Sequence, residues 1–400
     1  MIRLLPLLLA VIAMTVAPTS ALAQARPDID APSAIVIEAS TGEVAYAKDP
    51  SAKRSIASTT KLMTALLTLE SVALDDVLTV APYTPSGPES LGGLRAGERM
   101  TARDLLRALM LASANDAAVT LATRISGSVP AFVREMNTRA KQLGLKDTRY
   151  TNPIGLDTGG RSSARDLVKL AQVLRRNEFF RRTVDLPRVR VTSGAQPRTY
   201  LNRNTLVRRV PWVNGVKTGH TSLAGYVLVG SATRNGVTVI SAVLGTPSEA
   251  ARDAESLELL RYGLSRYRRT TLVKNGQALA RVDLKYRDEQ VRLVAGSGVQ
   301  RVLRRDRRAR LRVSGVPKEL DGPLTAGARQ GRVDVLVGGK VVASAPLVTA
   351  TAVEEAGLST RLAHVAGQGR TVLLAIVLVV CTVLLVLLRR RVVGRTGSRA

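Results

Sequence analysis

The sequence has a single cysteine, Cys381, so no intramolecular disulfide can form. Histidine is also scarce, because only His220 and His364 occur among the 400 residues. With so few thiolate and imidazole ligands, a structural zinc site is excluded. A serine nucleophile would need a nearby base, and with so few histidines a lysine has to be considered for that role.

Acidic residues are few compared with basic ones: 31 Asp and Glu against 59 Lys and Arg give a formal net charge of +28. Taken alone, this excess suggests nucleic acid or an anionic surface as a partner. The N-terminus argues against nucleic acid, because Arg3 precedes an apolar run, Leu4 to Val16, and Ala21-Leu22-Ala23 is a small-residue cleavage signal. We therefore predict a secretory signal peptide over residues 1–23, with an uncleaved anchor helix as the alternative. An exported chain meets cell-wall polymers and lipid headgroups.

A second apolar run lies at the C-terminus, where Thr371 to Leu388 contains no charged residue. As a helix it would be ~27 Å long, close to the thickness of a bilayer core. We predict a transmembrane helix over residues 371–388 and a basic cytoplasmic tail over 389–400, because arginines stay on the cytoplasmic side. A polar stalk, 351–370, would precede the span. A buried core helix is the alternative.

Between these ends, the sequence pattern predicts two domains. Residues 28–266 begin with a strand hairpin over 34–47, continue through several helical patterns and return to strands, with Asn235-Gly236 marking a second hairpin. This order indicates a sheet with strands from both ends of the domain and helices between them. Residues 271–350 show short β runs with Gly and Pro turns, which predicts a small all-β domain.

Three motifs in the first domain contain residues suited to chemistry: Ser58-Thr59-Thr60-Lys61, Ser113-Ala114-Asn115 and Lys217-Thr218-Gly219. Ser58 and Lys61 are three residues apart at the start of an apolar helical pattern, so they share one helix face. A single S-x-x-K occurs often by chance. All three motifs in this order, at a helix, a helix break and a strand, form a specific signal. The alternatives are an ordinary helix N-cap for the first motif and a plain helix break for the second.

Through these motifs the sequence resembles the D-alanyl-D-alanine carboxypeptidases, which are penicillin-binding serine peptidases, over about residues 30–350. The similarity extends to Asn152-Pro153-Ile154-Gly155-Leu156 and Asn202-Arg203-Asn204-Thr205-Leu206. It implies an α/β fold like that of β-lactamases and transpeptidases, with an antiparallel sheet covered by helices on both faces and an all-helical lobe. It also implies removal of the terminal D-alanine from peptidoglycan stem pentapeptides through an acyl-enzyme, inhibition by β-lactam antibiotics such as penicillin, and no cofactor or metal.

The resemblance implies catalytic roles for Ser58, Lys61 and Ser113. Ser58 would attack the carbonyl carbon between two D-alanines, Lys61 would accept its proton, and Ser113 would relay a proton to the leaving amine. Lys61 must then be partly neutral, and lowering a lysine pKa by ~3 units from ~10.4 costs about 4 kcal/mol. Burial and a second cation, Lys217, would both lower that pKa.

The remaining implied site residues bind substrate: Asn115, Lys217, Thr218, Gly219, His220 and Arg252. Asn115 would hold the substrate amide, and the Lys217 strand would lie at a sheet edge, where it can pair with the peptide. The backbone N–H groups of Ser58 and His220 would form the oxyanion hole. Arg252 would lie near the substrate carboxylate, with a solvated helix cation as an equal alternative.

Two other functions stay open, a β-lactamase-like hydrolase and a non-catalytic cell-wall-binding scaffold. The middle motif is Ser-Ala-Asn and not the Ser-Asp-Asn of β-lactamases, which favours the peptidase. In the β domain, the arginine-rich segment Arg301–Arg312 is predicted to be a solvated β-hairpin. Contact of that segment with an anionic wall polymer or lipid headgroups is the functional alternative.

Overall fold

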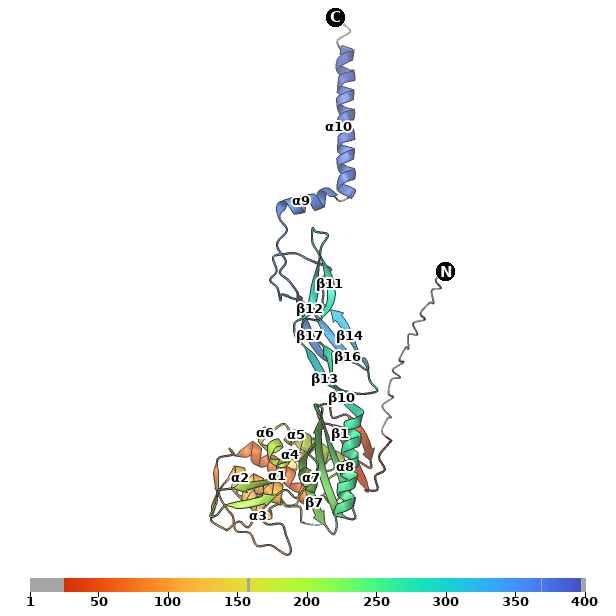
Figure 1. The fold of residues 1–400 in the computed structure, drawn as a ribbon. Coiled ribbons are helices and arrows are strands. Elements are labelled where there is room, and N and C mark those ends of the chain that lie inside the picture. Colours follow the sequence, from red (N-terminus) through yellow and green to blue (C-terminus); the bar gives the residue numbers. More distant parts are fainter. Residues whose placement is uncertain (1–24, 157–158, 368, 397–400) are drawn as a thin grey trace, which may run out of the picture. The chain divides into compact units, whose positions relative to one another are not determined.

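A five-stranded antiparallel sheet organises the first part of the chain (Figure 1). The computed structural model describes residues 25–156, 159–367 and 369–396, so the predicted signal peptide, 1–23, lies outside the described residues. In the order β2-β1-β9-β8-β7, the strands are β2 (Val44–Lys48), β1 (Ser33–Glu38), β9 (Val237–Thr246), β8 (Gly225–Arg234) and β7 (Val213–Thr221). Because β1 pairs with β9, strands from both ends of this unit form one sheet. Both predicted hairpins are confirmed.

Side chains alternate along β1 between two layers, because successive residues of a strand point to opposite faces. Ile35 and Ile37 belong to the core that includes residues of α1 (Lys61–Ser71) and α5 (Ala164–Leu174). Val36 instead meets α8 (Glu249–Arg266), where a Cβ added to Gly263 would lie 2.8 Å from its Cγ2. Helices therefore cover both faces of the sheet, as the fold class predicted (Figure 1).

The segment between β2 and β7 forms the helical lobe and two short strand pairs. Its further helical elements are η1 (Ala57–Thr60), α2 (Ala102–Arg107), η2 (Ala108–Ala112), α3 (Asn115–Ser126), α4 (Val129–Gln142), α6 (Glu178–Asp185) and α7 (Thr205–Arg209). The strands are β3 (Val77–Thr79), paired with β4 (Arg99–Thr101), and β5 (Arg188–Val191), paired with β6 (Arg198–Leu201). The Thr101 side chain accepts a hydrogen bond from the Asp104 N–H and so caps α2.

The second unit starts at Tyr267, directly after the predicted end of the first domain at residue 266 and four residues before the predicted start of the β domain, because its first strand begins there. Two strands, β10 (Tyr267–Val273) and β13 (Val299–Arg304), form one sheet. The other sheet has the order β14-β16-β17-β12-β11-β15, with β14 (Ala309–Ser314), β16 (Arg329–Val337), β17 (Lys340–Thr349), β12 (Gln290–Ala295), β11 (Ala278–Leu284) and β15 (Glu319–Leu320). Val273, Val299 and Val333 share one apolar core, so both sheets contribute to it.

The predicted β-hairpin over Arg301–Arg312 is wrong. β13 and β14 follow each other in sequence, yet β13 pairs with β10 and β14 pairs with β16. A short turn between two β runs does not decide their partners, because pairing also depends on which faces the core buries. The arginines of this segment are therefore divided between two sheets and the turn that joins them.

The C-terminal part contains two helices, α9 (Leu358–Gly367) and α10 (Gly369–Thr396). The predicted stalk, 351–370, thus includes a helix, and its first residues adjoin the β domain through an isolated bridge between Val353 and Leu324. Within α10, the 19-residue segment Val372–Arg390 is long and apolar enough to cross a membrane, with a mean hydropathy of 3.1 in an 18-residue window. The predicted span of 371–388 falls on this helix, and Cys381 is exposed on it.

Candidate active site

Ser58 and Lys61 meet where the 3-10 turn η1 continues into α1. Nζ of Lys61 donates to Oγ of Ser58 at 3.0 Å and to the carbonyl oxygen of Ile154 at 2.7 Å. The turn packs against the loop that contains Gly155, where a Cβ would lie 2.0 Å from the carbonyl oxygen of Ala57. Only glycine fits that close approach with φ at +85°.

Burial sets the protonation state of Lys61, whose side chain has no exposed surface. Loss of solvation lowers the pKa of Lys61 to about 7, while Glu89 and Asp116 act to raise it and Arg203 lowers it further. A neutral amine is thus accessible near physiological pH, as the sequence predicted. The expected cation does not act as predicted: Arg203 is the cation that lowers the Lys61 pKa, whereas Lys61 itself lowers the pKa of Lys217.

Ser113 and Lys217 form a second hydroxyl–amine pair. Ser113 follows η2 in the left-handed conformation, with φ of 62°, and this residue breaks the helix before α3. Nζ of Lys217 donates to Oγ of Ser113 at 3.0 Å and to the carbonyl oxygen of Thr218 at 2.9 Å. Burial, and then the charge of Lys61, hold the pKa of Lys217 well below its usual value.

Asn115 begins α3 and is almost fully buried. Its Nδ2 donates to Oε2 of Glu89 at 2.8 Å, and the Tyr83 hydroxyl donates to the same oxygen. Sequence reasoning missed Glu89 and Tyr83, because they lie in the Gly- and Pro-rich stretch 82–98, where no periodicity or motif distinguishes one polar residue from another.

Strand β7 carries Lys217, Thr218, Gly219 and His220 along the edge of the sheet, as predicted. It runs close to the nucleophile, because a Cβ on Gly219 would lie 3.0 Å from the carbonyl oxygen of Ile56 and 3.1 Å from the backbone nitrogen of Ser58. The exposed ring of His220 stacks on Tyr226, with 4.0 Å between ring centroids.

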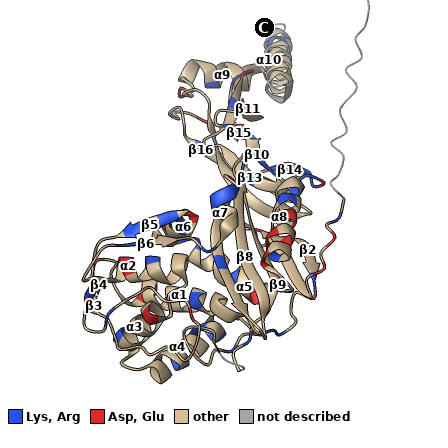
Figure 2. Ribbon diagram, turned by 60° about the horizontal axis from the view of Figure 1, so that its bottom comes forward, with Lys and Arg blue, Asp and Glu red and all other residues tan. Residues whose placement is uncertain are grey.

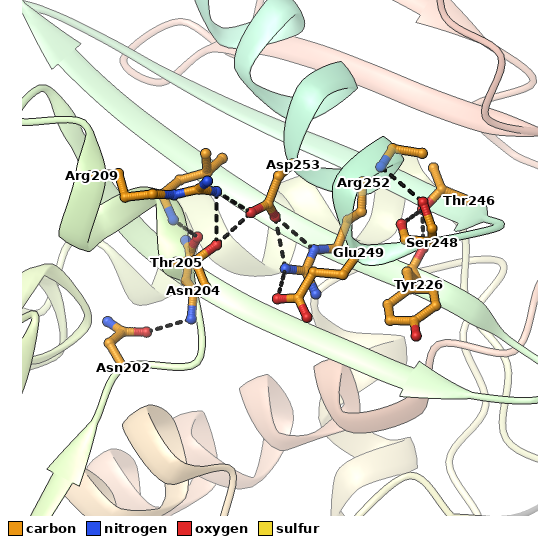
Figure 3. Close-up of polar contacts among 12 residues, drawn as sticks. Asn202, Asn204, Thr205, Arg209, Tyr226, Thr246, Ser248, Glu249, Arg252 and Asp253 are labelled. Atoms are coloured by element: carbon orange, nitrogen blue, oxygen red, sulfur yellow. Dashed lines mark hydrogen bonds and ion pairs between the residues drawn. The ribbon is translucent and has the colours of Figure 1, made fainter.

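Arg252 lies on α8 and is tied to two carboxylates (Figure 3). Its Nε and one terminal nitrogen donate to Oδ1 of Asp253 at 3.0 and 2.7 Å, and the same terminal nitrogen donates to Glu249 at 2.7 Å. Asp253 also accepts from Arg209 at 2.5 Å and from the Thr205 hydroxyl, both on α7. Asp253 therefore joins α8 to α7, a helix whose basic residues appear in Figure 2.

These groups lie in or around one cleft of about 660 Å³. Its walls include most of the predicted site residues, namely Ser58, Ser113, Asn115, Thr218, Gly219, His220 and Arg252. Lys61 and Lys217 lie buried beneath it, each bonded to one of the two serines. Arg203, which the sequence analysis did not select as a site residue, also lines the cleft. In the described part of the chain, no group of three or more His, Cys, Asp or Glu residues could hold a metal ion.

Known proteins resemble this chain over both of its units. A family model described as D-alanyl-D-alanine carboxypeptidase matches residues 20–248, and a model of the C-terminal domain of penicillin-binding protein 5 matches residues 267–355. The carboxypeptidase DacF of Bacillus subtilis is 31% identical over 353 residues, 85% of this chain and 90% of the relative. DacA of Escherichia coli is 32% identical over 82% of this chain and 85% of the relative. The crystal structure of penicillin-binding protein 5 from Haemophilus influenzae superimposes with a TM-score of 0.60 and 31% identity, over 82% of this chain and 99% of the other.

Proposed function

This chain belongs to the D-alanyl-D-alanine carboxypeptidase family of serine peptidases, and from that membership we propose that Ser58 is its nucleophile and Lys61 the base that activates it. The observation that carries this assignment is the 3.0 Å contact between Nζ of Lys61 and Oγ of Ser58 in a cleft. With its pKa lowered to about 7, Lys61 can accept a proton near neutral pH.

Acylation begins when Oγ of Ser58 bonds to the carbonyl carbon between the two D-alanines and its proton moves to Nζ of Lys61. The backbone N–H groups of Ser58 and His220 stabilise the oxyanion that forms. The C–N bond then breaks, and the hydroxyl of Ser113 passes the proton from Lys61 to the leaving nitrogen, which releases D-alanine. Water attacks the remaining ester and gives a proton to Lys61, and Lys61 passes that proton to Oγ of Ser58 as the shortened peptide leaves.

A β-lactam follows the same first step, but its amine stays attached to the acyl group after the ring opens. The tethered amine therefore does not leave the cleft and obstructs the approach of water to the ester, so the acyl-enzyme persists, which accounts for the penicillin binding that is characteristic of this family. The family membership also favours a peptidase over the two alternatives, a β-lactamase-like hydrolase and a non-catalytic scaffold. A β-lactamase would release the opened penicillin quickly, whereas we expect this enzyme to retain it.

The edge of β7 is the proposed substrate strand. The backbone of Thr218 and Gly219 pairs with the stem peptide as an added strand, and Asn115 holds its amide. Lys217, Arg203 and Arg252 supply positive charge for the terminal carboxylate. Asp253 and Glu249 offset the charge of Arg252. Arg203, whose Nε donates to the carbonyl oxygen of Ala112, therefore contributes more of that attraction.

Labelling by a fluorescent penicillin tests the assignment. The full chain should be labelled and should release D-alanine from a pentapeptide ending in D-Ala-D-Ala, and Ser58→Ala should abolish both. Ser51→Ala, which removes an exposed serine that bonds Arg165, is the matched control and should leave both intact. Release of D-alanine by Ser58→Ala would refute the role of Ser58.

We further propose that residues 1–23 direct export and that Val372–Arg390 crosses the membrane. The catalytic unit would then lie outside, where peptidoglycan is, and the arginines after the span would lie inside. Anchoring in the membrane would keep the enzyme close to newly made wall.

The segment Arg301–Arg312 is proposed to contact anionic groups, either wall polymer or lipid headgroups. Arg305, Arg307 and Arg308 lie in the exposed turn between β13 and β14. Replacing these three with serine should weaken retention on immobilised polyphosphate and on vesicles with anionic lipid. The difference between the variant and the unaltered chain should be smaller at high salt, where both bind poorly. Equal retention of both chains at low salt would contradict the contact.

A further inference from the structure

The carboxylate of Glu89 accepts four hydrogen bonds at the wall of the cleft. Oε1 accepts from the N–H and the hydroxyl of Ser86, both at 3.0 Å. Oε2 accepts from Nδ2 of Asn115 at 2.8 Å and from the hydroxyl of Tyr83. These donors act against the effect of burial and leave the pKa of Glu89 below its usual value, so the group is ionised at neutral pH.

An ionised carboxylate fixes which way the Asn115 amide faces. Such a group only accepts hydrogen bonds, so the amide NH₂ must face Glu89 and the amide oxygen must face away from it. Oδ1 of Asn115 is buried and has no hydrogen-bond partner among the described residues. A buried acceptor without a donor costs about 1–3 kcal/mol. The site therefore holds a buried acceptor on a residue that lines the cleft, and this acceptor is ready for an N–H donor.

The charge of Glu89 also acts on Lys61. Among the charged groups near Lys61, Glu89 and Asp116 favour its protonated form, and Arg203 opposes it. Asp116 is engaged by backbone N–H groups of Gly92 and Leu94. Glu89 lines the cleft itself, on the wall that also holds Asn115.

We propose that Glu89 is a positioning residue of this site: it fixes Asn115 with the amide oxygen reserved for an N–H donor, and its negative charge stabilises the ammonium that Lys61 becomes when Ser58 gives up its proton. The donor is an N–H of the bound peptide or of that ammonium. Through Asn115, Glu89 places the amide, and through space it favours proton transfer to Lys61. This inference rests on the proposed roles of Ser58 and Lys61.

The test is the pH dependence of acylation by a fluorescent penicillin, measured on the full chain in detergent. Glu89→Gln keeps the size of the side chain and removes its charge. The limb of the profile that rises with pH should shift to lower pH, because the Lys61 pKa falls when a nearby negative charge is lost. The plateau rate should fall by about tenfold or more, because the amide of Asn115 is no longer held in one orientation.

Glu89→Asp separates the two effects and serves also if Glu89→Gln does not fold. It keeps the charge but shortens the reach to Asn115, so we expect a rising limb close to that of the unaltered chain and a lowered plateau. Glu98→Gln is the matched control, because Glu98 is a buried carboxylate bonded to Arg198, and it does not line the cleft. Its profile should keep the rising limb where it is, even if the protein unfolds at a lower temperature.

Two results would overturn the inference. One is a Glu89→Gln profile that matches the unaltered chain in both limb and plateau, and the other is an equal shift in Glu98→Gln. Failure of the proposed function looks different, since the unaltered chain would then not be labelled or Ser58→Ala would still be labelled.

Discussion

At the scale of single residues, the site depends on a lysine that has lost its solvation. Lys61 is fully buried, and its position three residues after Ser58 brings its amine to the hydroxyl that we propose it deprotonates. Lys217 is buried in the same way and bonds Ser113. Burial lowers the pKa of both lysines, and the charge of Lys61 lowers the pKa of Lys217 further.

The first prediction concerns the sign of the pH dependence. Below the Lys61 pKa of about 7 the amine is protonated and cannot accept the Ser58 proton, so acylation by penicillin should fall as the pH drops through that value. Lys61→Arg keeps the charge and a donor but cannot lose a proton, so it should reduce the acylation rate by about 10³-fold at every pH. Rates measured from pH 5 to 9 check this. Activity of Lys61→Arg within tenfold of the unaltered chain would contradict it.

At the scale of elements, the cleft exists because three segments approach one another closely: η1, strand β7 and the break between η2 and α3. The approach of β7 to η1 requires the absence of a side chain at Gly219, whose Cα faces backbone atoms of Ile56 and Ser58. The left-handed Ser113 turns the chain between η2 and α3, which presents its hydroxyl to Lys217. Secondary structure thus places the side chains, and close backbone packing sets the distances.

The second prediction tests this packing. In Gly219→Ala, the new methyl group must displace β7 or η1 by a few tenths of an ångström, so we expect a loss of about 1–3 kcal/mol in unfolding free energy together with slower acylation. Gly87→Ala is the control, since a Cβ there meets nothing within 4 Å. Urea unfolding and penicillin labelling measure both effects. Unchanged acylation in Gly219→Ala would show that the contact between β7 and η1 tolerates a methyl group.

The third prediction concerns Asp253, which joins α8 to α7 (Figure 3). Asp253→Asn leaves the buried guanidinium of Arg252 without its main counter-charge, so the unfolding free energy should drop by about 3–5 kcal/mol. Glu249 is the other carboxylate bonded to Arg252, and its side chain is 54% exposed. Glu249→Gln should therefore lower the unfolding free energy by less than about 1 kcal/mol. Thermal unfolding of both variants decides between them. Equal losses would mean that Asp253 has no special part in linking the two helices.

At the scale of the whole molecule, the chain combines a catalytic unit, a β domain and one apolar helix. Each of the first two has its own apolar core, one reaching from β1 to the helical lobe and the other between the two β sheets. Units with separate cores can fold independently. The proposed chemistry therefore belongs to the first unit, and the C-terminal helix is the candidate for attachment to a membrane.

The fourth prediction follows from that division. A chain that ends at Gly357 lacks Val372–Arg390 and should leave the membrane fraction, while its acylation rate stays within about twofold of the full chain, because the catalytic unit keeps its own core. Fractionation and penicillin labelling measure these two outcomes. The full chain should stay with membranes in a high-salt wash, which removes proteins held only by charge. A shortened chain that remains in the membrane fraction would show that another segment anchors it.

The sequence by itself determined the chemistry and the order of the elements. The three motifs and the Asn235-Gly236 hairpin are local patterns, and local patterns are set by short-range geometry that a sequence reports directly. Even the neutral state of Lys61 could be predicted, because a helix start in an apolar pattern implies burial.

Only the tertiary structure decided which distant segments meet. Glu89 contacts Asn115 from a loop that shows no sequence pattern. Asp253 accepts hydrogen bonds from Arg252. Strands β13 and β14 pair with β10 and β16 and not with each other. These outcomes depend on long-range packing, where the choice of neighbours follows from the burial of whole faces. Spacing along the chain carries no record of that choice, so a serine and a lysine three residues apart could be predicted, and a glutamate 26 residues before Asn115 could not.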